Sequence, residues 1–383
     1  EVAEKVFDLV FLDENMPGIN GIETLQRIKA LRAHLPVIMI TKSEEEHIME
    51  EAIGSKISDY LIKPVNPNQI LLAVKKCLDG KRLLNEKVMS DYQMEFRELG
   101  MKMMGKMDVS DWYEVYGRLT HWTLELEKSE DDSMQEVLSM QFEDANRQFG
   151  KFVENNYESW IRAGDESGTS DIPILSHRVL PNLLPKAISS ANGRQVFLVV
   201  IDNLRLDQWR AIEPLLSDMF SVVSDEKYMS ILPTATQYAR NSLFAGMLPS
   251  EIKRLHPEWW ISEDEEGSKN KFEDKLLDEL LKRLSIEGKT SYHKVANLAA
   301  GRKLLDQFHE TKGESLTTIV YNFVDMLSHA RTDMEVIKEL ADDEAAYRSL
   351  TLTWFEHSAL RELLEKMADV NGRVIITTDH GTV

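Results

Sequence analysis

The feature that most restricts the fold is a set of short runs that are apolar at consecutive positions and end next to a polar residue. The clearest are "VFLVVI" (196–201), "TIVY" (318–321) and "VIIT" (374–377), with helical patterns between them. A strand that is apolar on both faces must be covered on both sides, which is typical of parallel sheets in α/β proteins. With 383 residues, the sequence predicts an α/β multidomain protein.

The first 83 residues show this alternation on a short period. The predicted strands are 7–13, 36–41 and 59–62, and the predicted helices are 21–32, 44–54 and 67–80. Asp13, Thr41 and Lys63 stand at the ends of the three strands. Because ligands bind at the carboxyl edge of an open parallel sheet, we expect these three side chains to form one site.

Together with "DENMPGINGIETL" and "YLIKPV", this pattern resembles the receiver domain of bacterial response regulators. The resemblance implies that Asp13 accepts a phosphoryl group from a sensor histidine kinase. It implies that the backbone carbonyl of Asn15 binds Mg²⁺, that Thr41 hydrogen-bonds the phosphoryl group and that Lys63 pairs with it. Tyr60 matches the aromatic position whose side chain rotates when the receiver switches to its activated conformation. A lysine, a hydroxyl and Mg²⁺ would neutralise the charge that builds up on the phosphoryl group.

The receiver resemblance covers only part of that domain. The family places a pair of acidic Mg²⁺ ligands after its first strand, and their position would precede Glu1. We therefore expect residues 1–83 to be a receiver whose N-terminal part is missing, and the chain to be a fragment that is phosphorylated inefficiently.

Residues 84–185 lose the strand signal and predict an all-α helical bundle that ends in a linker. One apolar stripe consists of Trp112, Tyr116, Leu119 and Leu126, and either Asp108 or Ser110 can serve as the N-cap. A second stripe has 4-3-4-3 spacing that suits packing against a neighbouring helix; it is formed by Leu138, Phe142, Ala145, Phe149 and Phe152. The Gly/Ser/Asp-rich stretch 163–173 is the predicted linker.

Composition excludes several functions. A net charge of −20 argues against tight binding to long DNA, which needs clustered basic side chains, and no helix-turn-helix with a basic recognition helix is present. No apolar run is long enough to span a membrane, and the first residues do not resemble a signal peptide. The single cysteine, Cys77, cannot form an internal disulfide, which favours the reducing cytoplasm.

Residues 186–383 contain the same pattern three times: a predicted buried strand is followed by a side chain that is able to bind a metal. The three strands lead to Asp202, to Asp325 with His329, and to Asp379 with His380. A threonine after a Pro-Thr turn, Thr236, precedes a further helical pattern. Oxygen and nitrogen ligands without cysteine suit Zn²⁺ or Mn²⁺ in a catalytic role.

These motifs resemble the alkaline phosphatase superfamily, in particular its nucleotide pyrophosphatase/phosphodiesterase branch and the PglZ family. The resemblance implies a threonine nucleophile at Thr236, with Thr234 the near alternative. One Zn²⁺ would be held by Asp202, Thr236, Asp379 and His380. A second would take Asp325, His329 and a histidine that the family places downstream of Val383, so the C-terminal part of this domain is expected to be missing.

The order of receiver, helical bundle and PglZ-like domain resembles PorX-type response regulators associated with type IX secretion. That resemblance implies a cytoplasmic homodimer whose effector is a zinc phosphodiesterase or phosphatase for nucleotide or short oligonucleotide substrates. Two metal ions about 4 Å apart would clamp the phosphoryl group. The alternative is a signalling adaptor whose metal domain binds a protein partner such as a sigma factor or a secretion-motor component.

Overall fold

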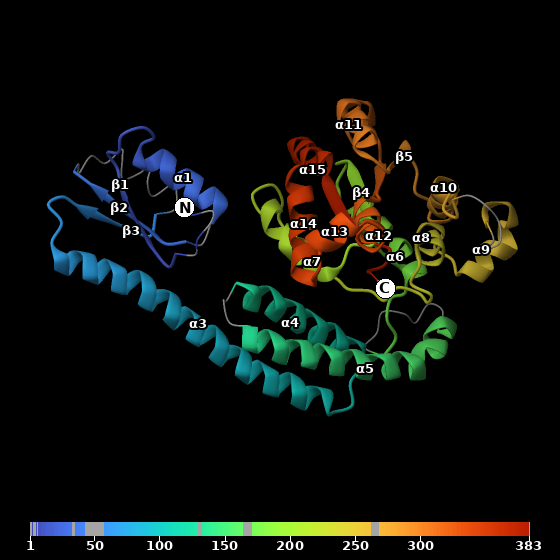
Figure 1. Ribbon diagram of the computed structural model, residues 1–383. Coiled ribbons are helices and arrows are strands. Elements are labelled where there is room, and N and C mark those ends of the chain that lie inside the picture. The colour runs from blue at the N-terminus through green and yellow to red at the C-terminus, as the bar shows by residue number, and fades with distance from the viewer. Residues whose placement is uncertain are drawn as a thin grey trace. The chain divides into compact units, whose positions relative to one another are not determined.

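The computed structural model describes the chain except residues 1, 3, 4, 6, 33, 34, 43–56, 129–131, 164–170, 262–267 and 383, and describes only the backbone of 79–86, 132 and 133. The chain divides into two compact units, Glu1–Arg97 and Glu98–Val383, which are considered separately (Figure 1). The helix predicted at 44–54 and most of the predicted linker lie outside the described residues. None of the helices in the described part of the chain is both long and apolar enough to cross a bilayer.

The first unit contains a parallel three-stranded sheet in the order β1-β2-β3. Its elements are β1 (Val10–Asp13), α1 (Gly21–Leu31), β2 (Val37–Thr41), β3 (Asp59–Ile62) and the start of α3 (Pro67–Met103). Helix α1 begins where the side chain of Asn20 accepts a hydrogen bond from the backbone N–H of Glu23 at 2.7 Å. Because all three strands are parallel, their carboxyl ends meet at one edge of the sheet.

Helix α3 runs further than the sequence pattern suggests. The predicted helix ends at residue 80, but α3 continues without interruption to Met103, past the boundary between the two units at Arg97. Gly80 costs about 1 kcal/mol of helix propensity, and no proline follows Pro67 in the helix. A glycine alone is therefore a weak stop signal.

Two helices at the start of the second unit pack side by side, α4 (Val109–Glu127) and α5 (Asp132–Arg162) (Figure 1). Of the two possible N-caps, Asp108 takes the role and forms a reciprocal capping box with Asp111. Trp112 is buried, and its ring lies 5.3 Å from that of Phe149 between centroids. Tyr116, in contrast, is 43% exposed although it belongs to the predicted stripe.

The rest of the second unit is built on a parallel four-stranded sheet in the order β5-β6-β4-β7. The strands are β4 (Val196–Ile201), β5 (Thr290–Val295), β6 (Leu316–Tyr321) and β7 (Arg373–Thr377). The helices and 3₁₀ turns are α6 (Ser176–Ser189), α7 (Leu206–Ile212), η2 (Glu213–Leu216), α8 (Thr236–Ala245), α9 (Pro249–Leu255), η3 (Pro257–Trp259), α10 (Glu273–Arg283), α11 (Leu298–Asp306), η4 (Phe308–Thr311), α12 (Phe323–Asp333), α13 (Glu335–Leu340), α14 (Glu344–Glu356) and α15 (Ala359–Asp369).

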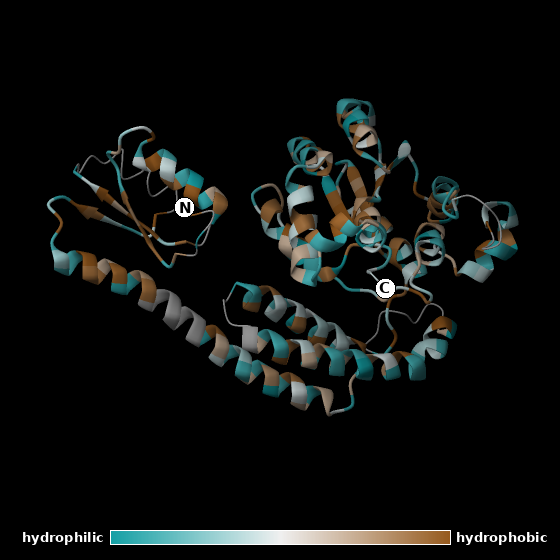
Figure 2. Cartoon of the chain, in the orientation of Figure 1, coloured by the Kyte–Doolittle hydropathy of each residue, from teal (hydrophilic) through white to brown (hydrophobic). Residues whose placement is uncertain are grey.

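Strand β4 shows why its sequence is apolar throughout. Phe197, Val199 and Ile201 pack into a core with α7, α11, α14 and α15, whereas Val196, Leu198 and Val200 pack into another with α6, α8 and α10. Every residue of β4 is buried, and Figure 2 shows hydrophobic strands enclosed by helices that carry both hydrophilic and hydrophobic residues. The predicted sheet with helices on both faces is confirmed, and it places the end of β4 at the centre of the domain.

Candidate functional site

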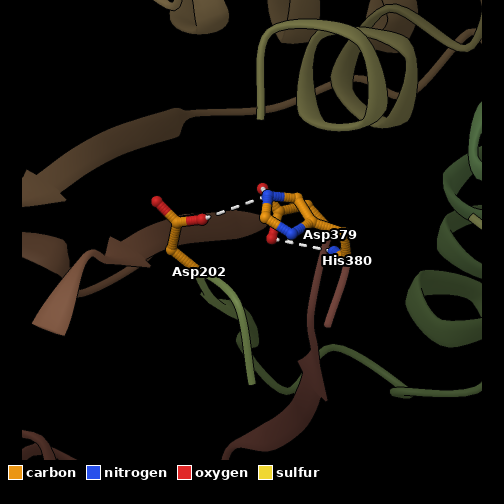
Figure 3. Close-up of side chains that lie close together, drawn as sticks. All are labelled: Asp202, Asp379 and His380. Atoms are coloured by element: carbon orange, nitrogen blue, oxygen red, sulfur yellow. Dashed lines mark hydrogen bonds and ion pairs between the residues drawn. The ribbon is translucent and has the colours of Figure 1, made fainter. Parts of the chain in front are cut away.

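Adjacent strands bring together Asp202, Asp379 and His380. Asp202 follows β4, and Asp379 and His380 follow β7, which pairs with β4 in parallel. All three are buried, and each offers one ligand atom within 4.8 Å of the other two (Figure 3). They form the group of side chains in the described part of the chain that could hold a metal ion.

Backbone groups orient the Asp379 carboxylate. Its Oδ1 accepts hydrogen bonds from the backbone N–H of Asn203 at 3.2 Å and of His380 at 3.0 Å. Its Oδ2 is buried without a hydrogen-bond partner, as are both carboxylate oxygens of Asp202. A buried carboxylate oxygen without a donor is costly, so Asp379 Oδ2 and Asp202 Oδ1 fit the role of metal ligands, whereas Asp202 Oδ2 forms an ion pair with Arg240.

His380 is oriented in the same way. Its Nδ1 lies 2.9 Å from the carbonyl oxygen of Gly381, so Nδ1 carries the proton and Nε2 presents a lone pair. Nε2 lies 3.6 Å from Asp379 Oδ2 and 3.8 Å from Asp202 Oδ1. Donors about 2.0 Å from a tetrahedral Zn²⁺ are roughly 3.3 Å apart, so this spacing needs little adjustment to accept a metal.

Thr236 reaches the same group from α8. It is the first residue of the helix, and its Oγ1 lies 2.9 Å from His380 Nε2. The preceding residue, Ala235, offers no side-chain cap, so the helix amides at this end face the site with partial positive charge. Asn270 donates from Nδ2 to the Thr236 carbonyl at 3.0 Å and so ties down the start of α8.

A buried arginine, which the sequence analysis missed, contacts the carboxylates. Arg240 Nη1 lies 2.6 Å from Asp202 Oδ2 and 3.7 Å from Asp379 Oδ2, and its Nε donates to Glu273 Oε1 at 2.6 Å. Burial alone would lower the pKa of Arg240, but the carboxylates of Glu273, Asp379 and Asp202 raise it overall, so the guanidinium stays charged. The available signal was its position four residues after Thr236, on the same face of α8.

The second predicted metal site is less completely formed than the first. Asp325 and His329 lie on α12 with Nε2 of the histidine 3.6 Å from Oδ1 of the aspartate, but the His329 side chain is 75% exposed. Burial, followed by the negative charge of Asp202, raises the pKa of Asp325, so this carboxylate lies within electrostatic reach of the first group. Among the described residues, neither joins the cluster of converging ligand atoms.

The candidate phosphorylation site lies at the carboxyl edge of the receiver sheet. Lys63 Nζ forms an ion pair with Asp13 Oδ2, and the backbone N–H of Asn15 donates to Asp13 Oδ1 at 3.1 Å. The hydrogen bond from Lys63 is the main cause of the lowered pKa of Asp13. The Thr41 hydroxyl donates to Glu14, a contact the sequence analysis did not anticipate, and Tyr60 is 38% exposed. The Lys63–Pro64 peptide bond is cis.

A cavity of about 540 Å³ lies beside the metal cluster. His380 and Thr234 line one part of it, and aromatic side chains of α4 and α5, including Trp112 and Phe149, line another. Both helices and the cluster belong to the second unit. The site therefore has room for a ligand larger than a phosphoryl group.

Comparison with known proteins gives three family matches. Residues 1–75 match the response regulator receiver domain, 82–161 the PorX response regulator linker domain, and 182–383 the BREX system PglZ alkaline phosphatase-like domain.

Individual relatives are similar to part of this chain. The transcriptional regulatory protein ZraR of Klebsiella oxytoca is 36% identical over 100 residues, which are 26% of this chain and 23% of that protein. The cyclic di-GMP phosphodiesterase response regulator RpfG of Xanthomonas campestris pv. campestris is 37% identical over 65 residues, 16% of this chain and 17% of that protein. A receiver domain protein (CheY-like) from Methanospirillum hungatei JF-1 is 28% identical, with 21% of this chain and 63% of that chain covered and a TM-score of 0.20.

The match to this chain thus covers less than a quarter of the length of the first curated relatives. The PglZ match, in contrast, spans more than half of the present sequence and contains the cluster around Asp202. The chain belongs to the PglZ alkaline phosphatase-like family, in which it carries a response regulator receiver and a PorX-type linker ahead of the phosphatase-like domain.

Proposed function

We propose that this protein is a response regulator whose effector domain is a zinc-dependent phosphodiesterase or phosphatase with Thr236 as its nucleophile. One observation supports this most strongly. Asp202, Asp379 and His380 converge on a buried point, and the hydroxyl of Thr236 lies 2.9 Å from the histidine nitrogen that faces this point. Nothing about simple packing requires two unpartnered carboxylate oxygens, Asp202 Oδ1 and Asp379 Oδ2, beside a helix-terminal hydroxyl.

The residues that would hold the metal are Asp202, Thr236, Asp379 and His380, with Asp325 and His329 contributing to a second position. Zn²⁺ bound there would stabilise negative charge on the phosphoryl oxygens and lower the pKa of a hydroxyl that it contacts. Mg²⁺ is the ion we expect at the receiver, near Asp13.

The protein's own groups account for the rest of the reaction. Thr236 Oγ, after losing its proton to solvent, attacks phosphorus in line with the ester bond. That bond breaks, the departing oxygen takes a proton from water, and a phosphothreonine remains. A water molecule then displaces Thr236 from phosphorus and releases the phosphate product. Throughout, the amides at the start of α8 offer positive partial charge to the phosphoryl oxygens.

The cavity beside His380 favours an ester with a substantial organic group. Its volume of about 540 Å³ and its aromatic walls suit a nucleotide or a short oligonucleotide, because bases stack on aromatic side chains. The net charge of −20 disfavours a long polyanion, whereas a small phosphoester needs only local neutralisation.

Control would come from the receiver. A sensor histidine kinase would phosphorylate Asp13, and the modified receiver would favour one arrangement of a cytoplasmic homodimer over another. The PorX-type linker supports a role in regulating type IX secretion.

The test is hydrolysis of bis(p-nitrophenyl) phosphate and p-nitrophenyl phosphate by the full-length protein, combined with metal analysis. Replacement of Thr236 by Ala should lower kcat by at least about 10³-fold, as expected for loss of a nucleophile. Thr234→Ala is the matched control and should stay within a few-fold of wild type. Bound zinc without Thr236-dependent turnover of either ester would contradict the enzyme and favour the adaptor that binds a sigma factor or a secretion-motor component.

A further inference from the structure

Besides the candidate metal ligands, the buried charged side chains include an arginine and a glutamate that pair with each other. Arg240 and Glu273 are each at most 2% exposed and are 33 residues apart in sequence. Glu273 also accepts hydrogen bonds from the Tyr292 hydroxyl and from Lys294 Nζ, the latter at 3.1 Å. The carboxylate therefore has partners for both oxygens, and one of them is the guanidinium that contacts Asp202.

Arg240 is shared between two sets of acids. Its Nε hydrogen-bonds Glu273, whereas Nη1, 2.6 Å from Asp202 Oδ2, makes no hydrogen bond of good geometry. Asp202 consequently directs Oδ2 towards Arg240 and Oδ1 towards His380 Nε2. A guanidinium and a divalent cation would thus compete for the charge of the same carboxylate.

We propose that the Arg240–Glu273 pair is a positioning element that sets the cation affinity of the site formed by Asp202, Asp379 and His380. This inference rests on the proposed metal-dependent function. Arg240 orients Asp202 so that one oxygen faces the cation, and its positive charge weakens cation binding. Glu273 counters that effect, because it accepts a hydrogen bond from Arg240 Nε and balances part of the positive charge that the guanidinium presents to Asp202.

The proposed nucleophile, Thr236, lies on the same helix as Arg240. Thr236 and Arg240 lie four residues apart on α8. Two residues that are close in sequence contact this helix: Asn270 binds the Thr236 carbonyl, and Glu273 binds the Arg240 side chain. Asn270 and Glu273 therefore hold both the start of the helix that carries Thr236 and the guanidinium that contacts Asp202.

The two charges make opposite predictions for metal affinity. Glu273→Gln leaves Arg240 without its counter-ion, so Arg240 should bind Asp202 more strongly and the Kd for Zn²⁺ and Mn²⁺ should rise about tenfold or more. Arg240→Met removes a repelling charge, so Kd should fall. Both variants should be less stable than wild type in chelator, because each removes one partner of a buried ion pair. A purely structural pair would weaken metal binding in both variants.

The experiment measures Kd for Zn²⁺ and Mn²⁺ by competition with a chromophoric chelator, using the full-length protein and circular dichroism to verify folding. Arg302→Met and Glu362→Gln are matched controls, because they break a half-exposed arginine–glutamate pair outside the cluster and should leave Kd unchanged. If Arg240→Met does not fold, Arg240→Lys, which keeps the charge, should retain a Kd within a few-fold of wild type while Glu273→Gln does not.

The outcomes separate the two proposals. Wild-type protein that binds neither ion would overturn the metal-dependent function and this inference with it. Wild-type binding, together with an unchanged Kd in Glu273→Gln or with shifts of both variants in the same direction, would overturn the inference alone.

Discussion

Replacing Asp379 by Asn should expose the energetic cost of building the candidate metal centre. Asp379 is completely buried, and burial, assisted by the negative charge of Asp202, raises its pKa to about 7 from an ordinary value of 3.8. At about 1.4 kcal/mol per pKa unit, this difference corresponds to roughly 4 kcal/mol. Asn keeps an oxygen that can accept the backbone hydrogen bonds but carries no charge.

The direction of the pH effect follows from the raised pKa. The folded state holds the Asp379 proton more tightly than the unfolded state, so the stability from the protonated group is fully present below about pH 4 and is lost as the pH rises through about 7. In chelator, the free energy of unfolding of wild type should therefore fall relative to that of Asp379→Asn by an amount on the order of 2–3 kcal/mol between pH 5 and pH 8.

Urea unfolding followed by tryptophan fluorescence suits this measurement, because all seven tryptophans lie in the unit Glu98–Val383. Adding Zn²⁺ at 100 times its Kd should stabilise wild type by about 2.7 kcal/mol and the variant by much less. A stability difference between the two proteins that is equal at pH 5 and pH 8 in chelator would refute the reasoning.

Three further predictions test other parts of the chain. Lys63→Met should raise the pKa of Asp13 towards its ordinary value, since the Lys63 hydrogen bond is the main cause of its lowering; NMR titration of the carboxyl carbon would show this, and an unchanged value would contradict the ion pair. Burial lowers the pKa of His177 to about 4, so stability present above pH 6.5 should be lost towards pH 4, by about 3 kcal/mol in all; His177→Gln should lack this loss, and equal pH profiles would argue against a buried neutral imidazole. Trp112→Ala should cost about 3–5 kcal/mol in thermal unfolding, whereas Met140→Ala on the exposed face of α5 should cost under about 1 kcal/mol; similar costs would contradict the packing of α4 on α5.

Local pattern was sufficient for the strands and their terminal residues. The side chains of β4 had to be apolar at every position because both faces of the strand are covered, and that requirement is visible in six consecutive letters. The same pattern predicts that Asp202 and Asp379 lie just beyond the carboxyl ends of their strands, because each aspartate comes shortly after the end of a hydrophobic run.

Local pattern was insufficient where distant segments meet. The importance of Arg240 depends on Glu273, which comes from the start of α10, and on Asp202, which follows a strand near the sheet centre. The strand order β5-β6-β4-β7 is also not the order of the sequence, so the β4–β7 pairing that joins Asp202 to Asp379 could not be read from spacing. The length of α3 was also not predicted, because the glycine at position 80 suggested a helix end but the helix continues to Met103.

The sequence by itself determined which side chains could bind a metal or a phosphoryl group and the secondary structures that carry them, because periodicity and strand termination are local properties of the chain. Only the tertiary structure decided which of those side chains meet. It brought Thr236 and His380 to 2.9 Å and left His329 largely exposed. The physical reason is that burial and charge pairing depend on neighbours in space, which packing of the whole domain selects.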